Sequence, residues 1–207
     1  MLKDSEWVRQ PGDRYEIRLS GSGGQGLILA GIILAEAAGI YGGRFVAQTQ
    51  SYGPEARGGV SRSDVIISDE EIDYPKAIKF DMLMAMNQKS CDQYFSDLKP
   101  NGILLVDSTF VSEVPLEGAV TIPFTQIARE EVGKEFVANI VSLGALTEFC
   151  PLLNGEVLEK AVLGRVPRGT EALNRTALRT GIEAAARFRK KMARRAVAPE
   201  DYKLEED

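Results

Sequence analysis

The chain has 207 residues, of which 44% are hydrophobic and 27% are charged, and its formal net charge is -5 at pH 7. These values predict one globular domain, and the negative charge argues against a protein that binds nucleic acids or anionic membranes in general. Histidine is absent, which excludes Ser-His triads and histidine-ligated metals.

Apolar runs and the residues that interrupt them predict alternating strands and helices. We expect strands at residues 15–20, 43–48, 60–68, 81–86, 103–106 and 120–123, and helices at 27–39, 88–98, 125–131, 137–149, 155–163 and 171–195. This order predicts an α/β fold with a mostly parallel, twisted sheet, helices on both faces and a helical C-terminal part. Residues 15–195 are expected to form a single domain, preceded by an extension over 1–14 and followed by an acidic tail over 196–207.

A glycine-rich turn joins the first strand to the first helix. It reads G-S-G-G-Q-G, and its candidate binding residues are Gly21, Gly23, Gly24, Gln25 and Gly26. Glycine allows a sharp turn and a close backbone approach, and the free N–H groups of the following helix attract an anion. The turn is therefore a candidate site for a phosphate or for a partner backbone.

Two other interpretations of this turn stay open. The spacing G-x-G-x-x-G also predicts a dinucleotide site, but such a site needs a carboxylate after the second strand, about 20 residues on. The second predicted strand instead ends in Ala47-Gln48-Thr49-Gln50, which argues against NAD or FAD. In the third interpretation the glycines serve only a tight turn and close helix packing.

The segment at residues 48–62 is polar, rich in glycine and interrupted by Pro54, so we expect a long loop. Long loops in compact domains are often functional. Its candidate binding residues are Ser51, Tyr52, Glu55, Arg57, Gly58 and Gly59. In a parallel sheet, ligands lie at the carboxyl ends of the strands. We expect this loop, the glycine turn, Asn87 and Asp107-Ser108 to meet at that edge.

The chain contains two cysteines, Cys91 and Cys150, each in an apolar setting. Two cysteines cannot supply the four thiolates of an iron–sulfur cluster or of a structural zinc site. No stretch approaches about 18 consecutive apolar residues, and the N-terminus lacks the apolar segment of a signal peptide. We therefore expect a cytoplasmic protein that does not enter a membrane.

The glycine turn and the loop S-Y-G-P-E-A-R-G-G-V-S-R resemble the gamma subunit of 2-oxoacid:ferredoxin oxidoreductases. The turn E-I-D-Y-P and the segments around Asn139 and Asn174 fit the same resemblance, which covers residues 15–190 in order. The run Arg57-Gly58-Gly59-Val60-Ser61 is more similar to the 2-oxoglutarate type than to the pyruvate type.

The resemblance implies a subunit of an enzyme that oxidatively decarboxylates a 2-oxoacid to an acyl-CoA and passes electrons to ferredoxin. The gamma part is similar to a swivelling, Rossmann-like module near the coenzyme A site. This chain has neither the G-D-G of a thiamine diphosphate site nor cluster cysteines. Thiamine diphosphate, magnesium and iron–sulfur clusters are therefore expected in alpha, beta and ferredoxin-like delta partners, and no catalytic residue is expected in this chain.

Within that framework the candidate residues named above are expected to support assembly and the site of coenzyme A, the co-substrate. The isolated chain should be inactive, and it could form a homodimer. Alternatives are a purely structural subunit, a gamma-like subunit of a pyruvate or indolepyruvate oxidoreductase, and a free-standing nucleotide-binding oxidoreductase.

Overall fold

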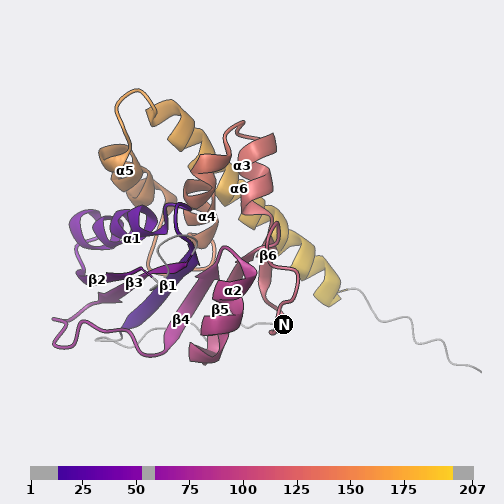
Figure 1. Ribbon diagram of the computed structural model, residues 1–207. Coiled ribbons are helices and arrows are strands. Elements are labelled where there is room, and N and C mark those ends of the chain that lie inside the picture. Colours follow the sequence, from indigo (N-terminus) through magenta and orange to yellow (C-terminus); the bar gives the residue numbers. More distant parts are fainter. Residues whose placement is uncertain (1–13, 53–58, 198–207) are drawn as a thin grey trace, which may run out of the picture.

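The computed structural model describes residues 14–52 and 59–197 (Figure 1). The predicted extension over residues 1–14, except for Arg14, and almost all of the predicted acidic tail lie outside these residues. The strands are β1 (Tyr15–Ser22), β2 (Phe45–Ser51), β3 (Val60–Ser68), β4 (Phe80–Ala85), β5 (Leu98–Asp107) and β6 (Val120–Ile122). The α-helices are α1 (Leu27–Glu36), α2 (Gln88–Tyr94), α3 (Phe124–Glu130), α4 (Ala138–Leu146), α5 (Gly155–Arg165) and α6 (Glu171–Val197).

The strands form one six-stranded sheet in the order β2-β3-β1-β4-β5-β6. Three neighbouring pairs are parallel, namely β1 with β4, β4 with β5 and β5 with β6. The two other pairs, β1 with β3 and β2 with β3, are antiparallel. The α/β class is confirmed, and the sheet is mixed because β3 returns between β1 and β2.

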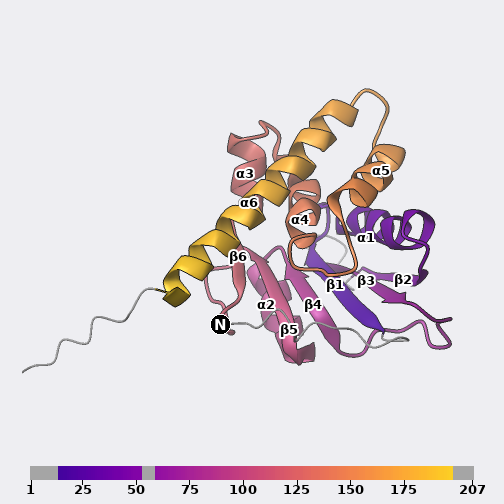
Figure 2. The same cartoon turned by 180° about the vertical axis from the view of Figure 1, so that it is seen from behind.

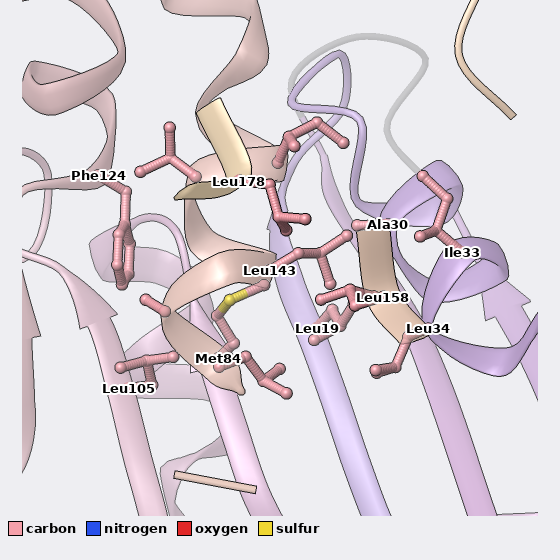
Figure 3. Close-up of a cluster of buried hydrophobic side chains, with 14 of the residues drawn as sticks. Leu19, Ala30, Ile33, Leu34, Met84, Leu105, Phe124, Leu143, Leu158 and Leu178 are labelled. Atoms are coloured by element: carbon pink, nitrogen blue, oxygen red, sulfur yellow. The ribbon is translucent and has the colours of Figure 1, made fainter. Parts of the chain in front are cut away.

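Helices cover both faces of the sheet, but unequally. Helix α2 lies on one face, whereas α1 and the helices α3 to α6 gather on the other (Figures 1 and 2). The larger core lies on the second face, where Leu19 and Met84 of the sheet point toward Leu143 of α4 and Leu158 of α5 (Figure 3). The expected helices on both faces and the helical C-terminal part are both confirmed.

Helix α1 is apolar around most of its circumference because it is enclosed on several sides. Its buried residues Ala30, Ile33 and Leu34 belong to the larger core. A methyl group added at Gly31 would overlap the Ser63 side chain, so α1 packs closely on β3 at this point. The predicted helix at residues 27–39 ends in a π-helical turn, Ala37–Tyr41, before the chain enters β2.

Under α2 the sheet carries a buried ion pair. The Arg18 guanidinium donates through Nε and Nη2 to the two Asp64 carboxylate oxygens, both at 2.7 Å. It also lies 4.1 Å from the ring centroid of Phe80 and 4.4 Å from that of Tyr94. Paired hydrogen bonds and ring stacking satisfy this buried cation, and the pair joins β1 to β3.

Several predicted boundaries differ in the structure. The predicted loop at residues 48–62 is shorter, because β2 continues to Ser51 and β3 begins at Val60. Polar residues extend β2 there, since it is the outer strand of the sheet and needs only one buried face. Strand β5 begins at Leu98 rather than at residue 103. Leu98 pairs with Phe80 of β4, and after an irregularity the regular pairing with β4 runs from Ile103.

Candidate binding site at the carboxyl edge of the sheet

The glycine turn closes on itself through the side chain of Gln25. The Gln25 Oε1 atom accepts from the backbone N–H of Ser22 at 2.7 Å, and its Nε2 donates to the Met86 carbonyl at 3.3 Å. A side chain at Gly21 would overlap Gln25 Oε1 and Leu27, so Gly21 is a packing glycine inside the turn. Both polar atoms of the Gln25 side chain therefore form hydrogen bonds within the chain. We expected this side chain to contact a phosphate or a neighbouring chain.

Gly26, the residue before the first turn of α1, has the left-handed conformation (φ 72°) and provides no side-chain cap. The first N–H groups of such a helix have no partner within the helix. The Asn139 side chain, at the start of α4, donates through Nδ2 to the Gly26 carbonyl at 3.1 Å. The positive ends of the dipoles of α1 and α4 therefore lie together beside the turn.

The outer part of the turn is open to solvent at Gly23 and Gly24. The backbone N–H of Gly23 donates to the Gly59 carbonyl at 3.2 Å, which ties the turn to the start of β3. Gly24 has a φ of 93°, a conformation that side chains rarely adopt. At Gly23 and Gly24 the exposed surface of the turn is therefore backbone.

The segment around β2 and β3 reaches the same edge. Strands β1 and β2 both pair antiparallel with β3, so they run in the same direction and Ser22 and Ser51 end at one edge. Ser51 and Tyr52 are exposed there, and Gly59 is buried against the glycine turn. The structure thus brings Gly21, Gly23–Gly26, Ser51, Tyr52 and Gly59 to one edge. The remaining candidates, Glu55, Arg57 and Gly58, lie outside the described residues.

Asn87 and Asp107 also lie at this edge, as the topology predicts, but both hold the backbone in place. Asn87 caps α2, accepting from the Ser90 N–H at 2.8 Å, and donates through Nδ2 to the Ser22 hydroxyl at 2.6 Å. The fully buried Asp107 carboxylate accepts from the Thr125 hydroxyl at 2.5 Å. The contact of Asn139 with the turn was not anticipated, because no local pattern links residues so far apart in sequence.

The described residues do not offer a metal or cluster site. Within them, no three His, Cys, Asp or Glu side chains gather closely enough to hold a metal ion. Cys91 lies in the small core under α2 and Cys150 in the large core on the other face. Burial, and to a lesser extent Asp92, raises the pKa of Cys91 to about 11, so its thiol is protonated at neutral pH and is a poor nucleophile.

The sheet order also bears on the dinucleotide interpretation. A dinucleotide-binding fold places a parallel strand beside the first strand and uses a carboxylate at its end. Here the antiparallel strand β3 separates β1 from β2, and the three residues that end β2 are Thr49, Gln50 and Ser51. This geometry argues against an NAD or FAD site in the same turn.

Comparison with known proteins decides the family. The model of the pyruvate ferredoxin/flavodoxin oxidoreductase family matches residues 16–184. The chain belongs to this family. The expected resemblance to its gamma subunits is confirmed as well, since a crystal structure of the keto/oxoacid ferredoxin oxidoreductase gamma subunit from Geobacter sulfurreducens superposes with a TM-score of 0.77. That gamma subunit is 50% identical, and the match covers 84% of this chain and 98% of the other.

Two further members of the family are informative. The 2-oxoglutarate synthase subunit KorC of Methanocaldococcus jannaschii is 53% identical over 176 residues, 83% of this chain and 94% of that protein. The 2-oxoglutarate:ferredoxin oxidoreductase of Magnetococcus marinus, solved with 2-oxoglutarate, coenzyme A and succinyl-CoA bound, superposes with a TM-score of 0.73 at 26% identity. That match covers 86% of this chain but only 32% of the longer one.

Helix α1 is apolar but short and carries charge only at Glu36. No helix among the described residues has the length and apolar character to cross a bilayer.

Proposed function

We propose that this chain is the gamma subunit of a 2-oxoglutarate:ferredoxin oxidoreductase, acting in the cytoplasm. The complex oxidatively decarboxylates 2-oxoglutarate and releases an acyl-CoA. The observation that carries the proposal is the 53% identity with a 2-oxoglutarate synthase subunit over nearly its whole length. The structural likeness to an oxidoreductase that holds 2-oxoglutarate and coenzyme A supports the same substrates.

The proposal divides the chemistry between chains. Partner alpha, beta and delta subunits hold thiamine diphosphate, magnesium and the iron–sulfur clusters, and ferredoxin accepts the electrons. The two cysteines of this chain are buried on opposite faces of the sheet, which fits a chain that carries no cluster of its own. Its contribution is to the assembly and to the site of coenzyme A.

The glycine turn is the part that we assign to coenzyme A. Its phosphates are anionic, and the uncapped start of α1 presents N–H groups and a positive dipole end beside the exposed Gly23 and Gly24. Arg57 belongs to the segment whose two ends, Tyr52 and Gly59, lie at the same edge. A guanidinium can pair with a phosphate in fork geometry, so we assign Arg57 the second contact with coenzyme A.

One observation favours a second candidate, a purely structural role for the turn. The Gln25 amide and the Gly23 N–H are already bonded within the chain, so the turn holds its shape without a ligand. In that case substitutions in the turn would affect stability or assembly and leave the use of coenzyme A unchanged.

Replacement of Gly23 by alanine separates the two candidates. A Cβ at Gly23 has no atom within 4 Å, so the variant should fold and assemble while a methyl group intrudes on the phosphate position. In the assembled complex we expect the KM for coenzyme A to rise about tenfold, the loss of one charge-assisted contact, with kcat and the KM for 2-oxoglutarate unchanged. Arg57→Ala should act in the same direction.

The control is Gly164→Ala, which adds the same methyl group on α5 with only ordinary contact near Tyr41. An unchanged KM for coenzyme A in both Gly23→Ala and Arg57→Ala would reject the coenzyme A assignment. The choice of substrate is tested separately, by comparing turnover with 2-oxoglutarate, pyruvate and indolepyruvate. Faster turnover with either of the last two would reject 2-oxoglutarate as the substrate.

A further inference from the structure

The two edges of the described sheet differ in their protection against pairing with another chain. One edge strand, β6, has only three residues, whereas the other, β2, has seven. Proteins usually protect a long edge strand with lysine, proline, a bulge or a covering element. The sequence of β2 is F-V-A-Q-T-Q-S and contains no charge, no proline and no glycine. Its outer row of N–H and C=O groups is therefore a ready template for a further strand.

Exposed apolar side chains occur at the start of β2 and in the turn that precedes it. Ile40 and Tyr41, in the π-helical turn before β2, are 73% and 44% exposed, and Phe45, the first residue of β2, is 50% exposed. Both views show α1 and β2 together at the same end of the molecule (Figures 1 and 2). We call Ile40, Tyr41 and the strand Phe45–Ser51 the β2 edge surface.

Between Ile40 and Ser51 the sequence has one charged residue, Arg44, and its side chain is paired within the chain. The Arg44 side chain donates through Nε to the Asp69 carboxylate at 2.9 Å and through Nη1 to the Leu152 carbonyl at 3.4 Å. The β2 edge surface is consequently neutral and partly apolar. Water solvates such a surface poorly, and an apolar patch next to an open strand is typical of a protein interface.

We infer that the β2 edge surface binds the catalytic partner chain, which adds an extended, uncharged segment as a seventh strand beside β2. This inference rests on the proposed function. We assign its occupant from the comparison above, because the match with this chain covers only 32% of the longer Magnetococcus marinus chain, so this module is joined there to further polypeptide. In a complex where this module is a separate chain, it must contact the chains that correspond to the rest of that longer polypeptide through its exposed surface.

Amide hydrogen exchange on the assembled complex tests the strand addition directly. We compare this chain alone with this chain bound to the other subunits of the oxidoreductase from the same organism. New interstrand hydrogen bonds should slow exchange in the peptide that contains Phe45–Ser51 by about tenfold or more. The edge strand β6, which the proposal leaves free, serves as the internal reference and should be unchanged.

A double variant, Ile40→Asp with Phe45→Lys, tests the apolar contacts. Both side chains are at least half exposed, so the fold should tolerate the changes, and charge beside an edge strand opposes pairing. The Kd for the partner chain should rise about tenfold or more. The matched control is Phe136→Lys, in the 3-10 turn Glu135–Val137 between α3 and α4, where the side chain is 71% exposed. The Kd of this variant should match wild type.

Each alternative has its own result. Equal partner affinity of the double variant and the control, with no slowing in β2, overturns the inference. Concentration-dependent dimers of the purified chain with β2 already protected identify a second copy as the occupant and overturn it too. Protection of β2 in the isolated monomer would mean that another segment of this chain covers the edge, and this result would also overturn the inference. A complex with protected β2 that ignores 2-oxoglutarate supports the surface and rejects the proposed substrate.

Discussion

At the scale of single residues, two features of the structure require glycine at position 26. Its φ of 72° is unfavourable for any residue with a Cβ, and an added Cβ would lie 2.5 Å from Asn139 Nδ2. Asn139 lies this close to Gly26 because its side-chain amide donates a hydrogen bond to the Gly26 carbonyl. The start of α1 and the start of α4 are therefore held together by a glycine and an asparagine that only the fold brings into contact.

Gly26→Ala should accordingly lower the free energy of unfolding by about 2 kcal/mol, from the left-handed conformation and the overlap together. Urea denaturation measures the loss. Gly23→Ala, in the same turn but with free space around its Cβ, is the matched control and should stay within about 0.5 kcal/mol of wild type. Equal stability of the two variants would show that the turn is more plastic than the structure indicates.

The thiol of Cys91 should be inert in the folded chain. Burial, followed by the nearby Asp92 charge, raises its pKa from 9.0 to about 11, so the folded thiol keeps its proton where the unfolded one loses it. Stability from this group is complete below pH 9 and is lost as the pH rises toward 11. We expect no labelling by iodoacetamide at pH 8 without denaturant, and a shallower alkaline loss of stability in Cys91→Ala. Rapid labelling of the native chain would contradict the burial.

At the scale of elements, α4 and α6 cross in direct backbone contact. A methyl group at Gly181 would overlap the Val141 carbonyl oxygen, and one at Gly144 would overlap that of Leu178. Two glycines facing each other's helix allow this approach, so the amphipathic α6 can lie across the core-lining α4. This crossing fixes the helical C-terminal part on the sheet.

Gly181→Ala should therefore destabilise the protein although alanine is the better helix former. In an open helix position the change gains about 1 kcal/mol, whereas here overpacking should cost about 3 kcal/mol. Thermal unfolding of Gly181→Ala and of Gly164→Ala should move in opposite directions. A rise in Tm for both would mean that the two helices can separate at little cost.

At the scale of the whole molecule, the helices cover the sheet unequally, so that one face and two edges of the sheet differ in character. The face under α1, α4, α5 and α6 contains the large core and supplies most of the stability. The carboxyl edge leaves the glycine turn accessible, and the open side of β2 remains without a described partner strand. A module with one face covered by helices, an exposed glycine turn and, within the described residues, one edge strand without a partner suits a subunit that works within a larger assembly.

The sequence by itself determined most of the elements, because apolar periodicity, glycines and prolines act locally. It placed β3 correctly at Val60–Ser68, located α6 and predicted the α/β class. It also determined the glycine turn, and it limited the chemistry through the absence of histidine and the low number of cysteines. The family resemblance rested on motifs of this local kind.

Only the tertiary structure decided how these elements meet. Apolar alternation is the same in parallel and antiparallel strands, so it could not show that β3 lies between β1 and β2 and leaves β2 at the edge. The partners of the turn, Met86 and Asn139, stand 61 and 113 residues away from the residues they bond. Such contacts depend on the packing of the whole chain, and for that reason no local pattern could reveal that Gln25 is engaged or that Gly26 meets α4.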